Sequence, residues 1–322
     1  MKQFEFEQQN EKFWFDFEQE IKQWESNSPV DSVRHFAKRY RTLCHHAAQA
    51  ESRQYSPTLI SDLQRLSARA HHILYSHQSH YLSRFARWLV IDLPRNVRAE
   101  KTVVIWSHIL FYLPFILFFL LCTFNILNAR ELVGLNALQA EHSYAEMAKR
   151  TAAGENRPFN DNILMFGWYI FNNISIAFQA AASGLLFAIG TIYILVMNGY
   201  MIGTIFGHMT NVSHDISLNF FGFVATHGAF ELTGIVLSGA AGLKLGMAIV
   251  NPQGYSRKDA LKMQGKSASQ LIAAAFLFLF IAAFLEAFWS PITVISPYFK
   301  MTVALFCWIA VYAYLLLGGR KQ

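Results

Sequence analysis

The pattern of hydrophobic and polar positions along this chain changes near residue 100. Before that point apolar residues recur at helical spacing among polar ones, as in residues 58–75. The apolar positions of that stretch are Leu59, Leu63, Leu66, Ala70, Ile73 and Leu74. After residue 100, apolar runs of about 20 residues follow one another, which is long enough to cross a bilayer core. The pattern predicts an all-α protein with an N-terminal helical domain over 1–101 and a membrane helix bundle over 102–322.

The apolar runs predict about six membrane-spanning helices. The run at 163–207 is too long for a single span, and the small-residue stretch at 180–184 divides it into two helices joined by a tight turn. We expect the spans at about 103–127, 163–182, 184–207, 220–250, 268–289 and 299–317.

The basic segments agree with an even number of spans. Six spans place the segment before the first span, the 251–266 loop and the tail at Arg320 on one side of the membrane. An excess of Lys and Arg marks the cytoplasmic side, so both termini are expected in the cytoplasm. The basic residues expected at anionic lipid headgroups are Arg84, Arg87, Arg95, Arg98 and Lys101.

The composition indicates a membrane protein, and the sequence gives no support for a nucleic-acid partner. The 322 residues are 53% hydrophobic and 15% charged, whereas soluble domains carry about 25% charged residues. The formal charge of +6 fits basic cytoplasmic segments against an anionic leaflet. No motif that reads a nucleic-acid groove accompanies this charge, so no nucleic-acid partner is expected.

Small residues form two helix faces suited to close packing. They recur every four residues, first as Gly199, Gly203 and Gly207, and then as Gly234, Ser238, Gly242 and Gly246. Small residues at this spacing let helix backbones approach closely in membranes. These faces could pack helices within one subunit or form the seam of a homodimer, and the sequence leaves both open.

Polar side chains inside the predicted spans are the candidate site. A charge at bilayer depth costs roughly 2.5–3.5 kcal/mol and normally faces a protein interior or cavity. Glu231 lies in the fourth predicted span, Glu286 lies near the outer end of the fifth, and His227 is one helical turn from Glu231. The predicted cluster also includes the amides of Asn172, Asn173 and Asn198.

Three roles for this cluster compete. It could be structural, it could bind a divalent metal through His227, Glu231 and Glu286, or it could form a proton or ligand pathway. If the fourth span begins near residue 218, Glu231 lies about 20 Å along it, whereas Glu286 is one turn from the membrane surface. We therefore expect 218–228 to be a separate short or re-entrant segment, which its two glycines would permit.

No sequence pattern indicates an enzyme. The chain contains no G-x-S-x-G, Ser-x-x-Lys, H-E-x-x-H or phosphate-loop pattern.

Three blocks of this sequence resemble the stage II sporulation protein M family of bacterial integral membrane proteins. They are 172–203, with an Asn-Asn pair, G-x(5)-G-T and Asn-Gly; 227–246, beginning HGAFELTG; and 285–291, LEAFWSP. A weaker likeness covers 70–75. Altogether the resemblance extends over most of the chain, from about 35 to 318. Thr226 and Thr233 stand where family members tend to carry proline.

The resemblance implies a scaffold in the bacterial inner membrane. The sporulation member is a polytopic protein that helps to assemble a membrane complex with cell-wall hydrolases during engulfment. Similar proteins in bacteria that do not sporulate are often encoded beside an AAA+ ATPase. We expect a non-enzymatic component of an envelope assembly, with envelope or AAA+ ATPase partners. The alternative is a transporter or channel that uses Glu231 and Glu286 as pathway residues.

Overall fold

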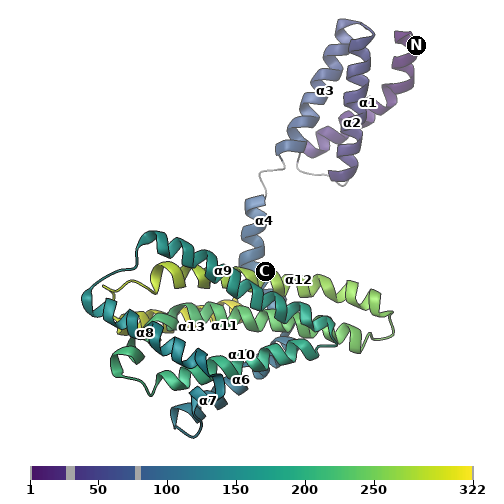
Figure 1. The fold of residues 1–322 in the computed structure, drawn as a ribbon. Coiled ribbons are helices and arrows are strands. Elements are labelled where there is room, and N and C mark those ends of the chain that lie inside the picture. Colours follow the sequence, from purple (N-terminus) through teal and green to yellow (C-terminus); the bar gives the residue numbers. More distant parts are fainter. Residues whose placement is uncertain (1, 27–32, 77–80, 321–322) are drawn as a thin grey trace. The chain divides into compact units, whose positions relative to one another are not determined.

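The computed structural model describes residues 2–26, 33–76 and 81–320, and the regular structure in these ranges is helical (Figure 1). The chain forms two compact units, Met1–Arg87 and Trp88–Gln322. The boundary between them falls inside the basic segment singled out in the sequence, so Arg95 and Arg98 belong to the second unit.

In the described part of the first unit, three long helices surround a core of their own. These are α1 (Gln3–Glu25), α2 (Val33–Ser52) and α3 (Pro57–Ser76), and α4 (Tyr81–Arg87) completes the unit. The helical stripe predicted in 58–75 contributes four residues to the core, which confirms its periodicity. The core consists of Phe6, Phe17, Ile21, Trp24, Phe36, Leu43, Ala50, Leu63, Leu66, Ala70 and Ile73.

The half-buried His46 makes the stability of this unit depend on pH. Its Nδ1 accepts a hydrogen bond from Trp14 Nε1 at 3.1 Å, and its ring meets those of Phe6 and Phe13 edge-on. Burial lowers the pKa of His46 below its usual value, and the neighbouring His45 lowers it further. Because the folded state disfavours protonation, this stabilisation is present above the ordinary pKa of about 6.5 and is lost as the pH falls below it.

We therefore expect the urea midpoint of the first unit to fall as the pH drops from about 7 to about 5. His46→Gln should flatten this dependence, whereas His72→Gln, at an exposed position, should leave it intact. Unfolding followed by Trp fluorescence across that pH range measures the difference. An unchanged pH dependence in His46→Gln would contradict the assignment.

Among its described residues, the second unit has six helices long and apolar enough to cross a membrane, as the sequence predicted. They are α6 (Lys101–Thr123), α9 (Phe159–Ala182), α10 (Ile189–Met209), α11 (His214–Val250), α12 (Arg257–Phe284) and α13 (Pro297–Leu317). Shorter elements are η2 (Trp88–Asp92), α5 (Leu93–Ala99), α7 (Ala129–Val133), α8 (Leu135–Ala153), η3 (Ser183–Leu185) and the π-helical η4 (Leu285–Trp289), which continues α12.

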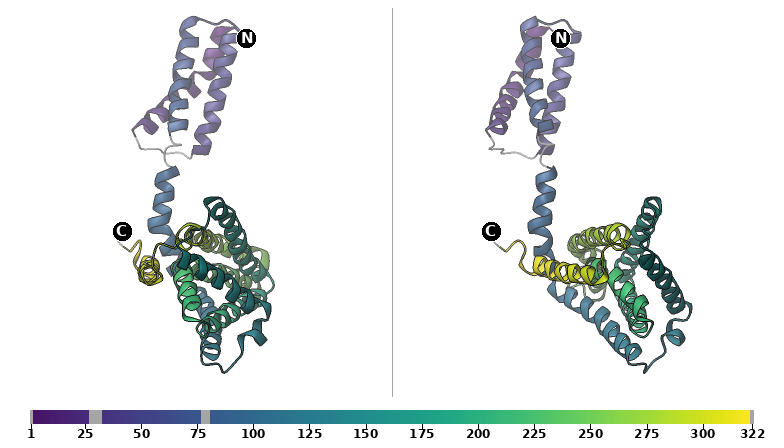
Figure 2. Two further views of the ribbon diagram at one scale, coloured as in Figure 1. Left: turned by 60° about the vertical axis from the view of Figure 1, so that its left-hand side comes forward. Right: turned by 90° about the vertical axis from the view of Figure 1, so that its left-hand side faces the viewer.

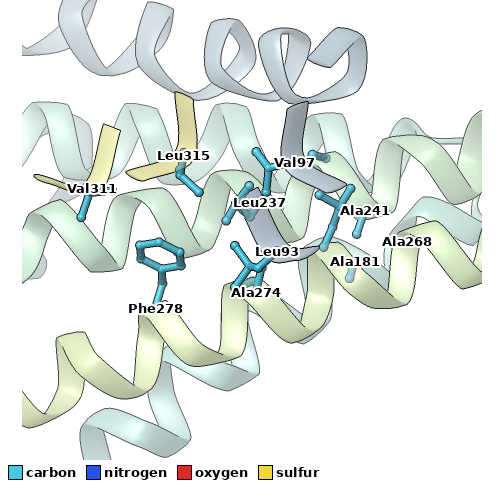
Figure 3. Close-up of a cluster of buried hydrophobic side chains, with 13 residues drawn as sticks. Leu93, Val97, Ala181, Leu237, Ala241, Ala268, Ala274, Phe278, Val311 and Leu315 are labelled. Atoms are coloured by element: carbon cyan, nitrogen blue, oxygen red, sulfur yellow. The ribbon is translucent and has the colours of Figure 1, made fainter. Parts of the chain in front are cut away.

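Helix α11 is the centre of this unit and contacts each of the other five long helices (Figures 1 and 2). Residues 232–243 of α11 are buried at every position. Figure 3 shows the apolar cluster around part of this stretch, where α5, α9, α12 and α13 converge on α11. Its labelled side chains are Leu93, Val97, Ala181, Leu237, Ala241, Ala268, Ala274, Phe278, Val311 and Leu315.

Both small-residue faces are used inside this one chain. A Cβ at Gly199, Gly203 or Gly207 would lie 2.2, 2.3 or 2.6 Å from a backbone oxygen of α6. On α11, a Cβ at Gly234 would meet the side chain of Leu279, and one at Gly246 would lie 2.4 Å from the backbone nitrogen of Ala188. Ser238 is fully buried. A homodimer would therefore need a surface other than these faces.

One end of the bundle is here called the basic end. Polar contacts there join the start of α6, the end of α11, the start of α12 and the end of α13. Arg95 Nε donates to the Gly319 carbonyl at 2.7 Å, and Arg98 Nη1 donates to the Leu315 carbonyl at 2.8 Å. Glu100 pairs with Lys244 Nζ at 2.5 Å and accepts from Ser267 Oγ. Arg95 and Arg98 before the first span, the segment that joins α11 to α12 and the end of α13 therefore lie at the same end.

The predicted break in 218–228 is wrong, because α11 is one continuous helix from His214 to Val250. Thr226 and Thr233, unlike proline, keep their backbone N–H groups and do not interrupt the helix. Glu231 lies close to Glu286 without any break in the helix. The first turns of α11 extend past the end of η4 and pack beside α8 and the start of α13, where Gly222 lies against Pro297.

Candidate functional site

A pocket of about 200 Å³ opens between α10, α11, η4 and α8. Its polar side chains are Tyr144, His227, Glu231 and Glu286. The apolar residues around them, together with Gly228, are Ile202, Ile205, Phe206, Val224 and Leu232. The pocket therefore combines an apolar wall with one compact group of ionisable side chains.

The structure brings His227, Glu231 and Glu286 together. One potential ligand atom from each lies within 4.8 Å of the other two. The helical spacing of four residues places His227 Nε2 3.7 Å from Glu231 Oε2. Glu286 comes from η4, a π-helical turn of the kind found often at functional sites.

A buried hydrogen-bond network contacts the Nδ1 side of the His227 ring, away from Glu231. Its Nδ1 lies 3.1 Å from Ser290 Oγ, and the Ser290 carbonyl accepts a hydrogen bond from Lys300 Nζ at 2.7 Å. Thr226 Oγ1 donates to the Lys300 carbonyl at 3.2 Å. Ser290 and Lys300 are 1% and 7% exposed. Neither residue was predicted from the sequence, although Ser290 lies within the LEAFWSP block.

Tyr144 covers the pocket from α8, a helix outside the six spans. Its ring packs edge-on against those of Phe220 and Phe223, at 4.9 and 5.8 Å between centroids. Burial raises the pKa of the Tyr144 phenol above its usual range, and the negative charges of Glu286 and Glu231 raise it further. The phenol therefore stays protonated beside the carboxylates at neutral pH. Sequence reasoning missed it because 128–160 reads as a polar connection.

The three asparagines make their hydrogen bonds elsewhere. Asn172 Nδ2 donates to Asn173 Oδ1 at 3.1 Å, and Asn198 Nδ2 donates to the Ile194 carbonyl of its own helix at 2.8 Å. Asn173 is buried at 3% exposure. Within the described ranges, none of the three hydrogen-bonds to His227, Glu231 or Glu286.

The arrangement can hold a cation, a shared proton or a small polar ligand. Two carboxylates and an imidazole offer oxygen and nitrogen donors, and the covering phenol offers a proton. Fold and site together define a class: a six-helix membrane bundle with an internal carboxylate–imidazole pocket and a separate N-terminal helical unit.

Comparison with known proteins gives the family. Residues 108–291 match the family model for stage II sporulation protein M, and the chain belongs to that family. All three blocks that carried the resemblance lie within the match. Residues 4–76, which span α1 to α3, match DUF8413, a domain of unknown function.

One curated relative is an uncharacterized protein of Methanocaldococcus jannaschii, MJ0793. It is 24% identical over 121 residues, which cover 37% of this chain and 67% of the relative. No solved structure matches the chain.

Proposed function

We propose that the protein is a non-enzymatic component of an envelope assembly in the bacterial inner membrane, with both termini in the cytoplasm. The observation that carries this proposal is the division of the chain into two units. The helices α1 to α3 pack around their own core, and the six spans form a separate bundle. A helical module joined to a membrane bundle can recruit a partner to the membrane without any chemistry of its own.

Helix α1 offers a surface for such a partner. Phe4 and Phe15 are 74% and 61% exposed, and their spacing of eleven residues, about three turns, places them on one face of the helix. The two side chains stand about 16 Å apart along this face, so they would be two separate apolar anchors for one partner rather than a single patch. We assign this face to an envelope or AAA+ ATPase partner.

The basic residues fit a cytoplasmic placement of the basic end. Lys101, at the basic end, is exposed, and so are Arg84 and Arg87 of the first unit; each basic residue near an anionic membrane surface contributes about 1 kcal/mol of attraction. This attraction would hold the segment before the first span against the headgroups.

The alternative function, a transporter or channel, would use the same pocket. The buried stretch 232–243 of α11 lies between the pocket and the basic end, which favours a site closed on that side over a pathway. Flux in proteoliposomes that is lost in Glu231→Gln would favour the transporter instead.

Site-specific photo-crosslinking in the full chain tests the recruitment proposal. With the crosslinker at Phe15, we expect a discrete adduct with one envelope or AAA+ ATPase protein in native membranes. The matched control places the crosslinker at Gln64, an exposed position on α3. Phe4→Ser should abolish the Phe15 adduct, because both side chains belong to the same face. Identical adducts at Phe15 and Gln64, or none at either position, would overturn the proposal.

A further inference from the structure

We propose that the pocket binds a divalent first-row transition-metal ion, with His227 Nε2 and one carboxylate oxygen each from Glu231 and Glu286 as ligands. This site is independent of the recruitment role proposed for the first unit.

The donor set and its spacing fit such an ion. Imidazole nitrogen with carboxylate oxygens is a ligand combination used for Zn²⁺ and related metals, at about 2.0–2.2 Å from the ion. Tetrahedral coordination at that distance separates ligand atoms by about 3.4 Å. The His227–Glu231 distance of 3.7 Å is already close to this value. The widest separation in the group is 4.8 Å at most, which exceeds this value by about 1.4 Å.

The hydrogen bond on the far side of His227 is an independent observation that points to a metal. A histidine that binds a metal usually donates its other ring N–H to an oxygen, which fixes the tautomer and the ring orientation. In the tautomer that carries its proton on Nδ1, that N–H donates to Ser290 Oγ and Nε2 presents its lone pair to Glu231. Lys300 anchors Ser290 through the backbone carbonyl, so the orientation of the imidazole is set before any ion arrives.

The two carboxylates of the pocket carry a negative charge that a bound cation would neutralise. Glu231 and Glu286 face each other, and no described residue donates a hydrogen bond to either carboxylate. Arg157 is near enough to influence Glu286 electrostatically, but no ion pair within 4.0 Å joins them. Two like charges held close together inside a protein are unfavourable unless a counter-charge or a proton separates them. A single divalent ion bound by both carboxylates neutralises the two charges.

The pocket also has room for the remaining ligands of the ion. A Cβ added at Gly228, in the pocket wall, would meet no atom within 4 Å, and the volume of about 200 Å³ can hold several water molecules. Tyr144 can donate its phenol proton to one of them. Water would thus complete the coordination of the ion on the open side.

Zn²⁺ binding by the full chain in lipid nanodiscs tests this site. We expect the wild type to hold one Zn²⁺ per chain more than Glu286→Gln after equilibrium dialysis with elemental analysis. Affinity at the pocket should fall by more than about 100-fold in Glu286→Gln and in Glu231→Gln. The matched control is Glu141→Gln, which removes the carboxylate that pairs with His208 at 3.0 Å outside the pocket. This variant should bind Zn²⁺ as the wild type does.

A second readout does not depend on the variants folding. The X-ray absorption spectrum of Zn²⁺ on the wild type should show a first shell of oxygen and nitrogen with a single imidazole. Equal Zn²⁺ content in wild type, Glu231→Gln and Glu286→Gln would overturn the proposal. A first shell with several imidazoles or with sulfur would overturn it too, because the ion would then be bound by other histidines or by cysteines.

Discussion

Gly242→Ala should prevent the membrane unit from forming its native packing. A Cβ at this position would lie 2.3 Å from the Ala180 carbonyl oxygen and 2.3 Å from Thr191 Oγ1. These two atoms are hydrogen-bonded to each other at 2.7 Å, which joins α9 to α10. The clash is with backbone and with a bonded hydroxyl, neither of which can move aside without separating the helices. We expect a loss of about 3 kcal/mol or more, at the upper end of the range for overpacked cores.

The matched control is Gly167→Ala in α9, where an added Cβ would meet no atom within 4 Å. Glycine in a helix interior is less favourable than alanine by about 1 kcal/mol, so this variant should be neutral or slightly stabilised. Thermal unfolding in detergent, together with the yield of monodisperse protein, measures both variants. Similar melting temperatures for the two would show that α9, α10 and α11 do not pack as described.

Phe17→Ala should unfold the first unit and leave the membrane unit folded. Phe17 is fully buried and packs against Phe36 at 5.1 Å between ring centroids. The guanidinium of Arg39 lies 5.1 Å from its ring and pairs with Glu20 at 2.5 Å. Removing a buried Phe side chain costs about 3–5 kcal/mol. Native domains are stable by roughly 0.05–0.15 kcal/mol per residue, so a loss of this size removes a large share of the stability of the unit and should leave much of the population without its fold.

Limited proteolysis of the full chain in nanodiscs, with cleavage sites mapped by mass spectrometry, measures this effect. Cleavage should become rapid throughout α1 to α3, while the six spans stay protected and melt as in the wild type. Phe15→Ala, at 61% exposure on the same helix, should leave cleavage unchanged. Simultaneous loss of both units in Phe17→Ala would contradict their independence.

The elements of the fold that depend on periodicity could be predicted from the sequence. Apolar runs located the six spans, and the stripe in 58–75 identified one wall of the first core. The pairing of His227 with Glu231 followed from their spacing on one helix. Each of these inferences needs only the geometry of a single helix, which local sequence specifies.

The rest of the site depends on how helices meet, which local sequence does not specify. A break in 218–228 would be needed only if the fourth span started at the membrane surface. The structure instead extends α11 beyond the end of η4, so Glu231 and Glu286 meet without a break. Lys300, near the start of the last span, suggests an interfacial charge, yet it is buried and donates to the Ser290 carbonyl. Tyr144 reaches the pocket from a helix whose composition is that of an exposed connection.

A cryo-electron microscopy structure of the full chain in nanodiscs with Zn²⁺, with elemental analysis of the same sample, for wild type and Glu231→Gln, tests the helix packing and the metal site together. We expect an unbroken α11 from His214 to Val250 and density between His227 Nε2 and the carboxylates of Glu231 and Glu286. Both this density and the bound metal should be lost in the variant. A helix broken within 218–228, or three side chains that bond only to one another or to the asparagine amides in a dry bundle, would contradict this expectation.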